Sequence, residues 1–121
     1  MIYDENNIFA KILRGEIPCD KIYEDDFVLS FHDKNPQKKI HALVIPKGKY
    51  IDLDDFSLNA SPDEMVGLIK GINKIAKKLG ISTEIGKGYR ALANISVHGG
   101  QEVLHLHFHL FGGEDVGRMV E

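Results

Sequence analysis

The chain has 121 residues, a formal net charge of −3 and a pI near 6.0. This length is typical of a single domain, and a content of 43% hydrophobic and 27% charged residues is that of an ordinary globular protein. The slightly acidic balance argues against nucleic acid and membrane surfaces as partners, because both require a basic face.

The single cysteine, Cys19, excludes an internal disulfide and a Cys-x-x-Cys metal site. The first seven residues are acidic and polar, unlike a secretory signal. No apolar run approaches the roughly 18 residues that span a bilayer. We therefore expect a cytoplasmic protein.

The first half of the chain predicts one short helix followed by strands. Residues Ile8–Gly15 carry apolar side chains at helical spacing, with Asn7 as a possible cap and Gly15 as the end. Short apolar runs predict strands at Lys21–Glu24, Phe27–Phe31 and Ile40–Pro46, with turns at Asp25–Asp26 and Asp33–Pro36. Residues Lys47–Asn59 are expected to be a polar connection.

A long helix is predicted in the second half. Ser61 and Glu64 form a capping box around Pro62, and the helix is expected to run to Leu79 and to end at Gly80. After it come a strand, a glycine-containing loop and a second strand, predicted at Tyr89–Asn94, Ile95–Glu102 and His105–Phe111. This order favours one α+β domain over residues 1–121, with a mainly antiparallel sheet.

The last of these strands carries half of the six histidines in five residues, as His105-Leu106-His107-Phe108-His109. Alternation at a period of two puts the imidazoles on one face, roughly 6.6 to 7 Å apart, and the apolar residues in the core. Such a row fits a metal site, a solvent-facing row, or a site that uses imidazole as nucleophile and proton donor.

The surroundings favour the third interpretation. No cysteine, and no carboxylate at ligand spacing, accompanies the row, which disfavours a metal site. Gly99-Gly100 precedes the row and Gly112-Gly113 follows it, and although such pairs often mark hairpin turns, glycine also lets backbone N–H groups approach an anion. Neutral histidine is both nucleophilic and a hydrogen-bond donor, and the middle position selects His107 as the nucleophile.

The seven-residue pattern His-φ-His-φ-His-φ-φ, with φ apolar, resembles the histidine triad (HIT) superfamily. Its flanks resemble the Hint branch of histidine triad nucleotide-binding proteins over about residues 7–113, which leaves 114–121 as a tail. The matching flanks are Asn7–Ile12, Gly15–Pro18, Tyr23–Asp26, Phe31–Asp33, Asn35–Gln37, His41 with Leu43–Lys47, Gly88–Arg90 and Gly99–Val103.

The resemblance implies a HIT-like fold with a five-stranded, mainly antiparallel sheet that continues across a homodimer. It implies binding of purine nucleoside monophosphates and hydrolysis of nucleoside 5′-phosphoramidates through a nucleotidyl-histidine intermediate, without cofactor or metal. Two alternatives stay open. One is a dinucleoside polyphosphate hydrolase, and the other is a nucleotide- or partner-binding module with little catalysis.

The resemblance also implies a role for each residue of the site. The intermediate forms on His107, His109 hydrogen-bonds the phosphate, His105 orients the nucleophile through its backbone carbonyl, and His41 completes the cluster. The implied nucleotide contacts are Asp33 on the ribose with Lys34 after it, the residues Ile12, Ile17, Phe31 and His32 around the base, and Asn94, Gly100, Gln101 and Glu102 at the phosphate.

Four positions depart from the family pattern. Glu102 stands where many relatives have serine, and we expect its backbone N–H to make the contact while its side chain stays peripheral, because a carboxylate repels a phosphate. Lys34 replaces an apolar residue. Asn7 and Ala10 stand where some bacterial relatives have zinc-binding cysteines, so that structural zinc site is absent.

Overall fold

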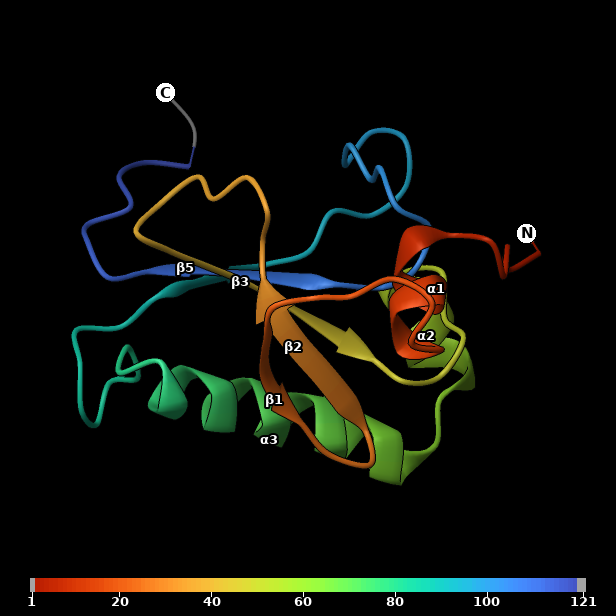
Figure 1. Ribbon diagram of the computed structural model, residues 1–121, viewed down its shortest axis with the longest axis horizontal. Helices are drawn as coiled ribbons and strands as arrows, with labels where there is room; N and C mark the ends of the chain where they lie inside the picture. The colour runs from red at the N-terminus through yellow and green to blue at the C-terminus, as the bar shows by residue number, and fades with distance from the viewer. Residues whose placement is uncertain (1, 120–121) are drawn as a thin grey trace.

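The computed structural model describes residues 2–119 and contains one antiparallel sheet with helices against it (Figure 1). The strands are β1 (Lys21–Glu24), β2 (Val28–His32), β3 (Ile40–Pro46), β4 (Arg90–Leu92) and β5 (Phe108–Gly112). The helices are α1 (Ile8–Leu13), α2 (Leu53–Asn59) and α3 (Pro62–Lys78). The predicted α+β class with a five-stranded antiparallel sheet is confirmed.

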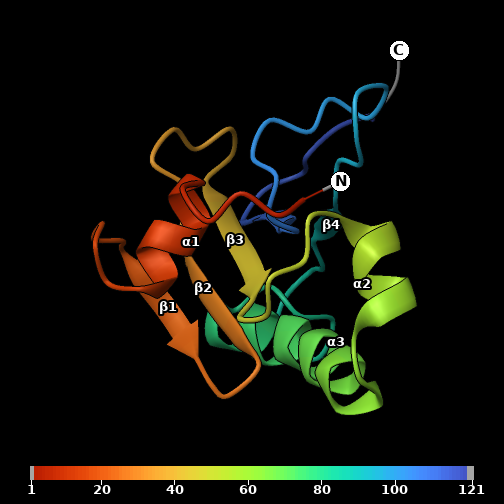
Figure 2. The same ribbon diagram turned by 90° about the vertical axis from the view of Figure 1, so that its right-hand side faces the viewer.

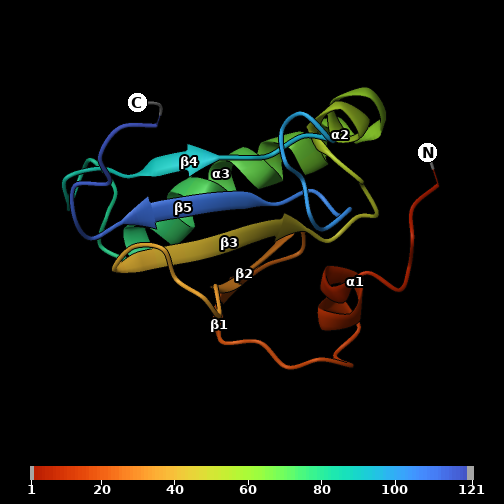
Figure 3. The ribbon, with the colours of Figure 1, turned by 90° about the horizontal axis from the view of Figure 1, so that it is seen from above.

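The strand order is β1-β2-β3-β5-β4, so β5 lies between β3 and β4 (Figure 3). In the register of β3 with β5, Leu43 is opposite His109 and His41 is opposite Phe111. The histidine motif therefore ends inside the sheet, where hydrogen bonds on both sides hold its backbone.

Alternation along the strands divides the interior into two clusters. In β3, Ala42 and Val44 belong to the cluster that includes Leu68, Ile72 and Ile75 of α3. Leu43 and Ile45 point to the opposite face and pack in the cluster that includes Phe9 and Ile12 of α1. Figure 2 shows α3 along one side of the strands and α1 away from it. Because side chains alternate, His41 and His109 lie on the same face as Leu43.

The predicted helix ends are present in the structure. The Asn7 side chain accepts the Ala10 N–H at 2.9 Å and begins α1. Ser61 and Glu64 form the expected capping box of α3, and Gly80 after this helix adopts a φ of +75° that favours glycine. None of the helices within residues 2–119 combines the length and the hydropathy needed to cross a bilayer.

One helix was not predicted, because residues Lys47–Asn59 were expected to be only a polar connection. This expectation was wrong, since α2 forms at Leu53–Asn59. The Asp52 side chain caps it by accepting the Asp55 N–H at 2.8 Å. Phe56 is its only fully buried residue and packs edge-on against Tyr50. A helix with a single buried side chain leaves almost no apolar periodicity in the sequence.

The histidine strand is shorter than predicted. Strand β5 begins only at Phe108, so of the three histidines only His109 lies in a regular strand. Before it, the Leu106 N–H donates to the Tyr50 carbonyl at 2.8 Å rather than to a neighbouring strand. The alternation of sides still holds, because Leu106 and Leu110 are buried in the cluster beneath α3. Strand β4 is likewise shorter than the predicted Tyr89–Asn94.

Candidate active site

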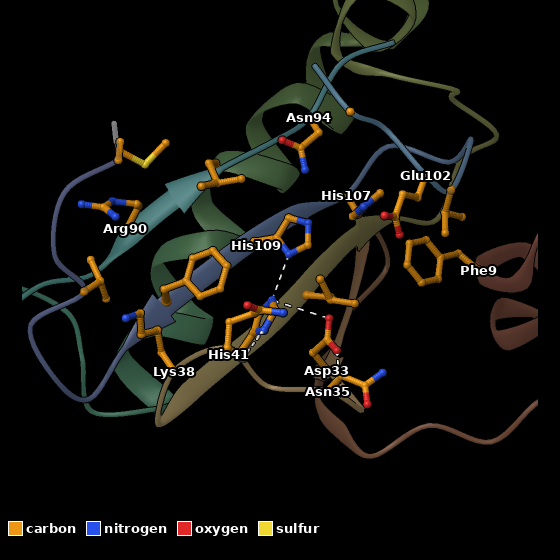
Figure 4. Close-up of a pocket in the computed structure, with 18 of the residues that line it drawn as sticks. Phe9, Asp33, Asn35, Lys38, His41, Arg90, Asn94, Glu102, His107 and His109 are labelled. Atoms are coloured by element: carbon orange, nitrogen blue, oxygen red, sulfur yellow. Dashed lines mark hydrogen bonds and ion pairs between the residues drawn. The ribbon is translucent and has the colours of Figure 1, made fainter. Parts of the chain in front are cut away.

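A cavity of about 700 Å³ opens beside the histidines (Figure 4). His107 and His109 line it from the motif and His41 from the neighbouring strand. The rest of the lining comes from both halves of the chain. It consists of Phe9, Asp33, Asn35, Gln37, Lys38, Leu43, Arg90, Leu92, Asn94, Gly100, Glu102, Val103, Phe111, Val116, Arg118 and Met119.

Hydrogen bonding fixes the proton of His107. Its Nδ1 lies 2.7 Å from the His105 carbonyl oxygen, and because a carbonyl only accepts, Nδ1 carries the proton and donates it. The Nε2 atom of a neutral His107 then carries the lone pair. The ring is 7% exposed and packs edge-on against Phe9, with ring centroids 4.9 Å apart. His107 is therefore held in the tautomer that a nucleophile attacking through Nε2 requires.

His105 is fully buried and does not line the cavity. Its Nε2–H donates to the Pro46 carbonyl at 2.8 Å. Its Nδ1 accepts from the Tyr3 hydroxyl at 2.6 Å. Both ring nitrogens are thus occupied, so the part of His105 that reaches His107 is its backbone carbonyl. Figure 2 shows the N-terminal segment that carries Tyr3 passing the chain that leads into β5.

A second chain of hydrogen bonds orients His109. The Gln37 N–H donates to Nδ1 of His41 at 3.1 Å, so the proton of His41 is on Nε2. This Nε2 lies 2.9 Å from Nδ1 of His109, which must then accept. The proton of His109 is left on its Nε2, and this assigns His109 as a hydrogen-bond donor. Its ring also stacks parallel to Phe111, with centroids 5.7 Å apart.

Burial lowers the pKa of all four histidines. The pKa of His105 falls from 6.5 to about 4 through burial, and that of His109 falls to about 4 through burial and the neighbouring His107 and His41. Burial also lowers the pKa of His107 and His41, while Asp33 acts in the opposite direction on both. All four rings are therefore neutral near pH 7, which leaves His107 unprotonated at Nε2.

Two carboxylates face the same cavity. Asp33 accepts the Asn35 N–H at 2.8 Å through Oδ1, and its Oδ2 lies 3.5 Å from Nε2 of His41. Glu102 lines the cavity, and its charge raises the pKa of His107. Glu102 is exposed although it lines the cavity, and the expected contact of its backbone N–H with a phosphate stays a prediction.

The glycine loop uses its own backbone donors. The N–H groups of Gly99, Gly100 and Gln101 donate to the carbonyls of Ile95, Val97 and Ser96, which lie in the same loop. In this conformation all three donors are paired within the loop, and the expected phosphate contact through Gly100 and Gln101 stays a prediction. The Gln101 side chain instead donates to the carbonyls of Ile51 and Val103, at 2.6 and 3.0 Å.

The structure brings only some of the expected residues to the cavity. The histidines 41, 107 and 109 line it together with Asp33, Asn94, Gly100 and Glu102. Ile12 and Phe31 are buried, and Ile17 packs beside them, in the cluster behind Leu43. His32 and Lys34 are exposed and Gln101 is half-buried, and none of the three lines the cavity.

Several residues at the site were not expected from the sequence. Tyr3, Phe9 and Gln37 contact the histidines, and Lys38 and Arg90 line the cavity. Phe9, Gln37 and Arg90 lie within the flanks that matched the family pattern, so the resemblance could have pointed to them. Nothing in the sequence pattern pointed to Tyr3, because its contact spans 102 residues.

One group in residues 2–119 has the composition of a metal site. Asp33, His41 and His109 each offer a ligand atom, all within 4.8 Å of one another. However, His41 and His109 are hydrogen-bonded to each other, and the remaining nitrogen of His41 accepts the Gln37 N–H. A metal ion would have to break this arrangement, whereas the hydrogen bonds already satisfy the nitrogens.

Comparison with known proteins gives one consistent family. The HIT domain profile matches residues 14–116. A purine nucleoside phosphoramidase of Escherichia coli K12 is 43% identical over 117 residues, which cover 96% of this chain and 94% of that protein. An Azospirillum brasilense HIT-like protein is 49% identical over 118 residues, 98% of this chain and 94% of its own length.

Solved structures agree with these relatives. A HIT family hydrolase from Clostridium thermocellum superposes with a TM-score of 0.84 at 39% identity and covers 98% of this chain and 99% of its own. A histidine triad protein from Clostridium difficile has a TM-score of 0.82 at 41% identity, with 97% and 98% covered.

Proposed function

The chain belongs to the HIT family, and from this premise we propose that it hydrolyses the P–N bond of purine nucleoside 5′-phosphoramidates. The observation that carries the proposal is the 2.7 Å contact of His107 Nδ1 with the His105 carbonyl. This contact leaves the Nε2 lone pair of a neutral imidazole beside a cavity of about 700 Å³. The relative named purine nucleoside phosphoramidase supports the substrate class.

In the first step, Nε2 of His107 attacks the phosphorus atom. A P–Nε2 bond forms and the P–N bond to the amine breaks. The bonding electron pair stays on the amine nitrogen, which takes a proton from solvent. The ring gains positive charge, and three neighbours favour that charge: the His105 carbonyl accepts the Nδ1–H, and Asp33 and Glu102 are negative.

The phosphoryl oxygens are stabilised best by a hydrogen-bond donor that is already oriented before the reaction, and His109 is such a donor. Its Nε2–H is fixed by the hydrogen bond that Nδ1 accepts from His41, so it donates without becoming a cation. In the second step, a water oxygen attacks the phosphorus, the P–Nε2 bond breaks, and the water gives up a proton to solvent. The products are the amine, a nucleoside monophosphate and free His107.

We assign the ribose to Asp33 and the base to the apolar side of the cavity. Asp33 keeps acceptor capacity beyond its bond to the Asn35 N–H, which two ribose hydroxyls can use. Phe9 and Leu43 line that side of the cavity, with Ile12, Ile17 and Phe31 packed behind them. Contacts of His32, Lys34, Asn94 and the 100–102 backbone with the nucleotide stay predictions.

We further propose that the chain forms a homodimer in the cytoplasm. Strand β4 ends the sheet with one edge open within residues 2–119. Two apolar residues of α3, Val66 and Ile69, are 51% and 65% exposed, and Figure 3 shows this helix behind β4 and β5. An open edge next to exposed apolar side chains suits a second copy of the sheet. The cytoplasmic location rests on the nucleotide substrate and on the free thiol of Cys19.

The proposal is tested with adenosine 5′-phosphoramidate and acid quenching. The native chain should release AMP and accumulate an acid-quenched adduct with the mass of one nucleotidyl group on the peptide that contains His107. The variant His107→Ala should lose both the adduct and at least about 10⁴-fold in rate, as expected for a nucleophile. Equal rates in the two proteins would overturn the mechanism, and no rate in either would favour a binding module.

A further inference from the structure

The charged residues of the cavity are divided between two sides. The carboxylates of Asp33 and Glu102 lie on one side of the His41–His109 pair, and Lys38 and Arg90 lie on the other (Figure 4). His107 lies on the side of the carboxylates. In the reaction proposed above, the phosphorus atom lies near His107 and His109. That reaction gives no role to Lys38 and Arg90 on the basic side.

The backbone on both sides of Lys38 is fixed. The Gln37 N–H donates to His41 at 3.1 Å, and the Lys39 N–H donates to the Glu114 carboxylate at 2.6 Å. Between them, Lys38 is half-buried and lines the cavity, whereas Lys39 is exposed and does not. The adjacent residues Lys38 and Lys39 carry the same charge, but only Lys38 has access to the cavity.

Arg90 and Arg118 extend the basic side. Arg90 begins β4, and its Nη2 donates to the Gly117 carbonyl at 2.5 Å, which holds the following residue, Arg118, along the cavity wall. A guanidinium has five N–H donors, so this single bond leaves others for a ligand.

Carboxylates near this side are already hydrogen-bonded. Glu114 accepts the Lys39 N–H and Asp115 accepts the Gly117 N–H at 2.9 Å. Within residues 2–119, neither carboxylate forms an ion pair with Lys38 or with the two arginines. Neither Glu114 nor Asp115 is among the residues that line this cavity, whereas Lys38, Arg90 and Arg118 are, so the charges at the cavity wall on this side are positive.

In-line displacement decides which part of the substrate meets this side. The attacking and leaving atoms lie on opposite sides of the phosphorus. If Nε2 of His107 attacks from the side of Glu102, the leaving group departs toward the side of Lys38 and Arg90 (Figure 4). An anionic leaving group is favoured there, because positive side chains lower the free energy of a negative ligand.

We propose that Lys38, Arg90 and Arg118 form a subsite for an anionic substituent on the leaving group. This inference rests on the proposed function. The shared chemistry is a carboxylate or phosphate a few bonds beyond the bond that breaks. Two kinds of leaving group carry such an anion. One is an amino acid that is joined to the nucleotide through its nitrogen and keeps a free carboxylate, and the other is the phosphate chain of a second nucleotide.

The test compares two AMP phosphoramidates that differ in charge, one of β-alanine and one of n-propylamine. Their dissociation constants are measured by calorimetry on His107→Ala, with and without Lys38→Gln, so that binding is read without turnover. His107→Ala should bind the β-alanine compound about three- to tenfold more tightly than the propylamine compound, and Lys38→Gln should remove most of that preference. Lys39→Gln is the matched control and should preserve it.

A preference that is absent from the start, or that Lys38→Gln and Lys39→Gln reduce equally, overturns the subsite. That result does not affect the proposed function, which depends on turnover and on the adduct at His107. Diadenosine tetraphosphate is the second probe. If Lys38→Gln weakens its binding more than that of the β-alanine compound, the subsite is supported and assigned to a phosphate chain. If Lys38→Gln weakens binding of the β-alanine compound more than that of diadenosine tetraphosphate, the subsite is supported and assigned to an amino acid.

Discussion

Removal of the Tyr3 hydroxyl tests how His105 supports the nucleophile. Tyr3→Phe keeps the ring, which lies edge-on to His105 with centroids 5.6 Å apart. It deletes only the donor that lies 2.6 Å from Nδ1 of His105. The bond from Nε2–H to the Pro46 carbonyl remains. The variant therefore isolates one buried hydrogen bond behind the catalytic motif.

The expected cost follows from burial. His105 is 0% exposed, and a buried acceptor left without a donor costs about 1–3 kcal/mol. Because Tyr3 itself is half-buried, water can replace part of the lost bond, and we expect about 1–2 kcal/mol of unfolding free energy. A looser His105 also moves the carbonyl that orients His107. We therefore expect kcat to fall about two- to tenfold with little change in KM, since positioning acts in the transition state.

Urea unfolding gives the free energy, and steady-state hydrolysis of adenosine 5′-phosphoramidate gives kcat and KM. Tyr23→Phe is the matched control. It removes a hydroxyl that donates to Asp25 at 2.8 Å, but this carboxylate also accepts the N–H groups of Phe27 and Val28. If Tyr3→Phe is no more destabilising than Tyr23→Phe, or if its kcat equals that of the native chain, Tyr3 does not support His105 in the way proposed.

Further predictions concern pH, charge, assembly and packing. The folded pKa of His105 is about 4 against 6.5 for an ordinary histidine, so between these values the unfolded chain binds more protons. Stability should be constant above about pH 7 and fall by about 3 kcal/mol from this residue as the pH drops from 6.5 to 4; equal urea midpoints at pH 4.5 and 7.5 would contradict this. Glu102→Gln removes a charge that raises the pKa of His107 and should lower kcat less than about tenfold, because the other stabilising groups remain; a hundredfold loss would show a direct catalytic role. Ile69→Lys puts a charge on the exposed face of α3 and should shift the mass measured by light scattering from dimer to monomer, whereas a monomeric native chain would refute the dimer. Leu110→Ala should cost about 2–5 kcal/mol in urea unfolding because the side chain is fully buried; a cost below 1 kcal/mol would contradict its place in the core.

The sequence predicted most of the regular elements because their signals are local. The capping box of Ser61 with Glu64 and the apolar run Ile40–Pro46 each lie within a few consecutive residues, and both are present in the structure. The alternation in the histidine motif also assigned the correct sides to Leu106 and Leu110. The period-two alternation therefore predicts which side a residue faces even at Leu106, which precedes the first residue of β5.

The remaining features depend on contacts that no local pattern contains. Helix α2 forms around one buried residue, Phe56, so its sequence has no apolar stripe. The N–H groups of Gly100 and Gln101 have partners in their own loop, and a glycine pair cannot reveal whether such donors face inward or toward a ligand. The contact of Tyr3 with His105 spans 102 residues, and it exists only after the two ends of the fold have met.

The position of β5 has a consequence for the order of folding. This strand follows all the others in sequence, yet it lies between β3 and β4 in the sheet. During synthesis the N-terminal part of a chain emerges first, so β3 must wait with an unpaired edge until the histidine motif has left the ribosome. The exposed edge of an apolar strand is prone to aggregation. The histidine motif, which carries the proposed nucleophile, thus also closes the sheet, and we expect a chain whose synthesis stops before His107 to lack the nucleophile and to leave the edge of β3 open to aggregation.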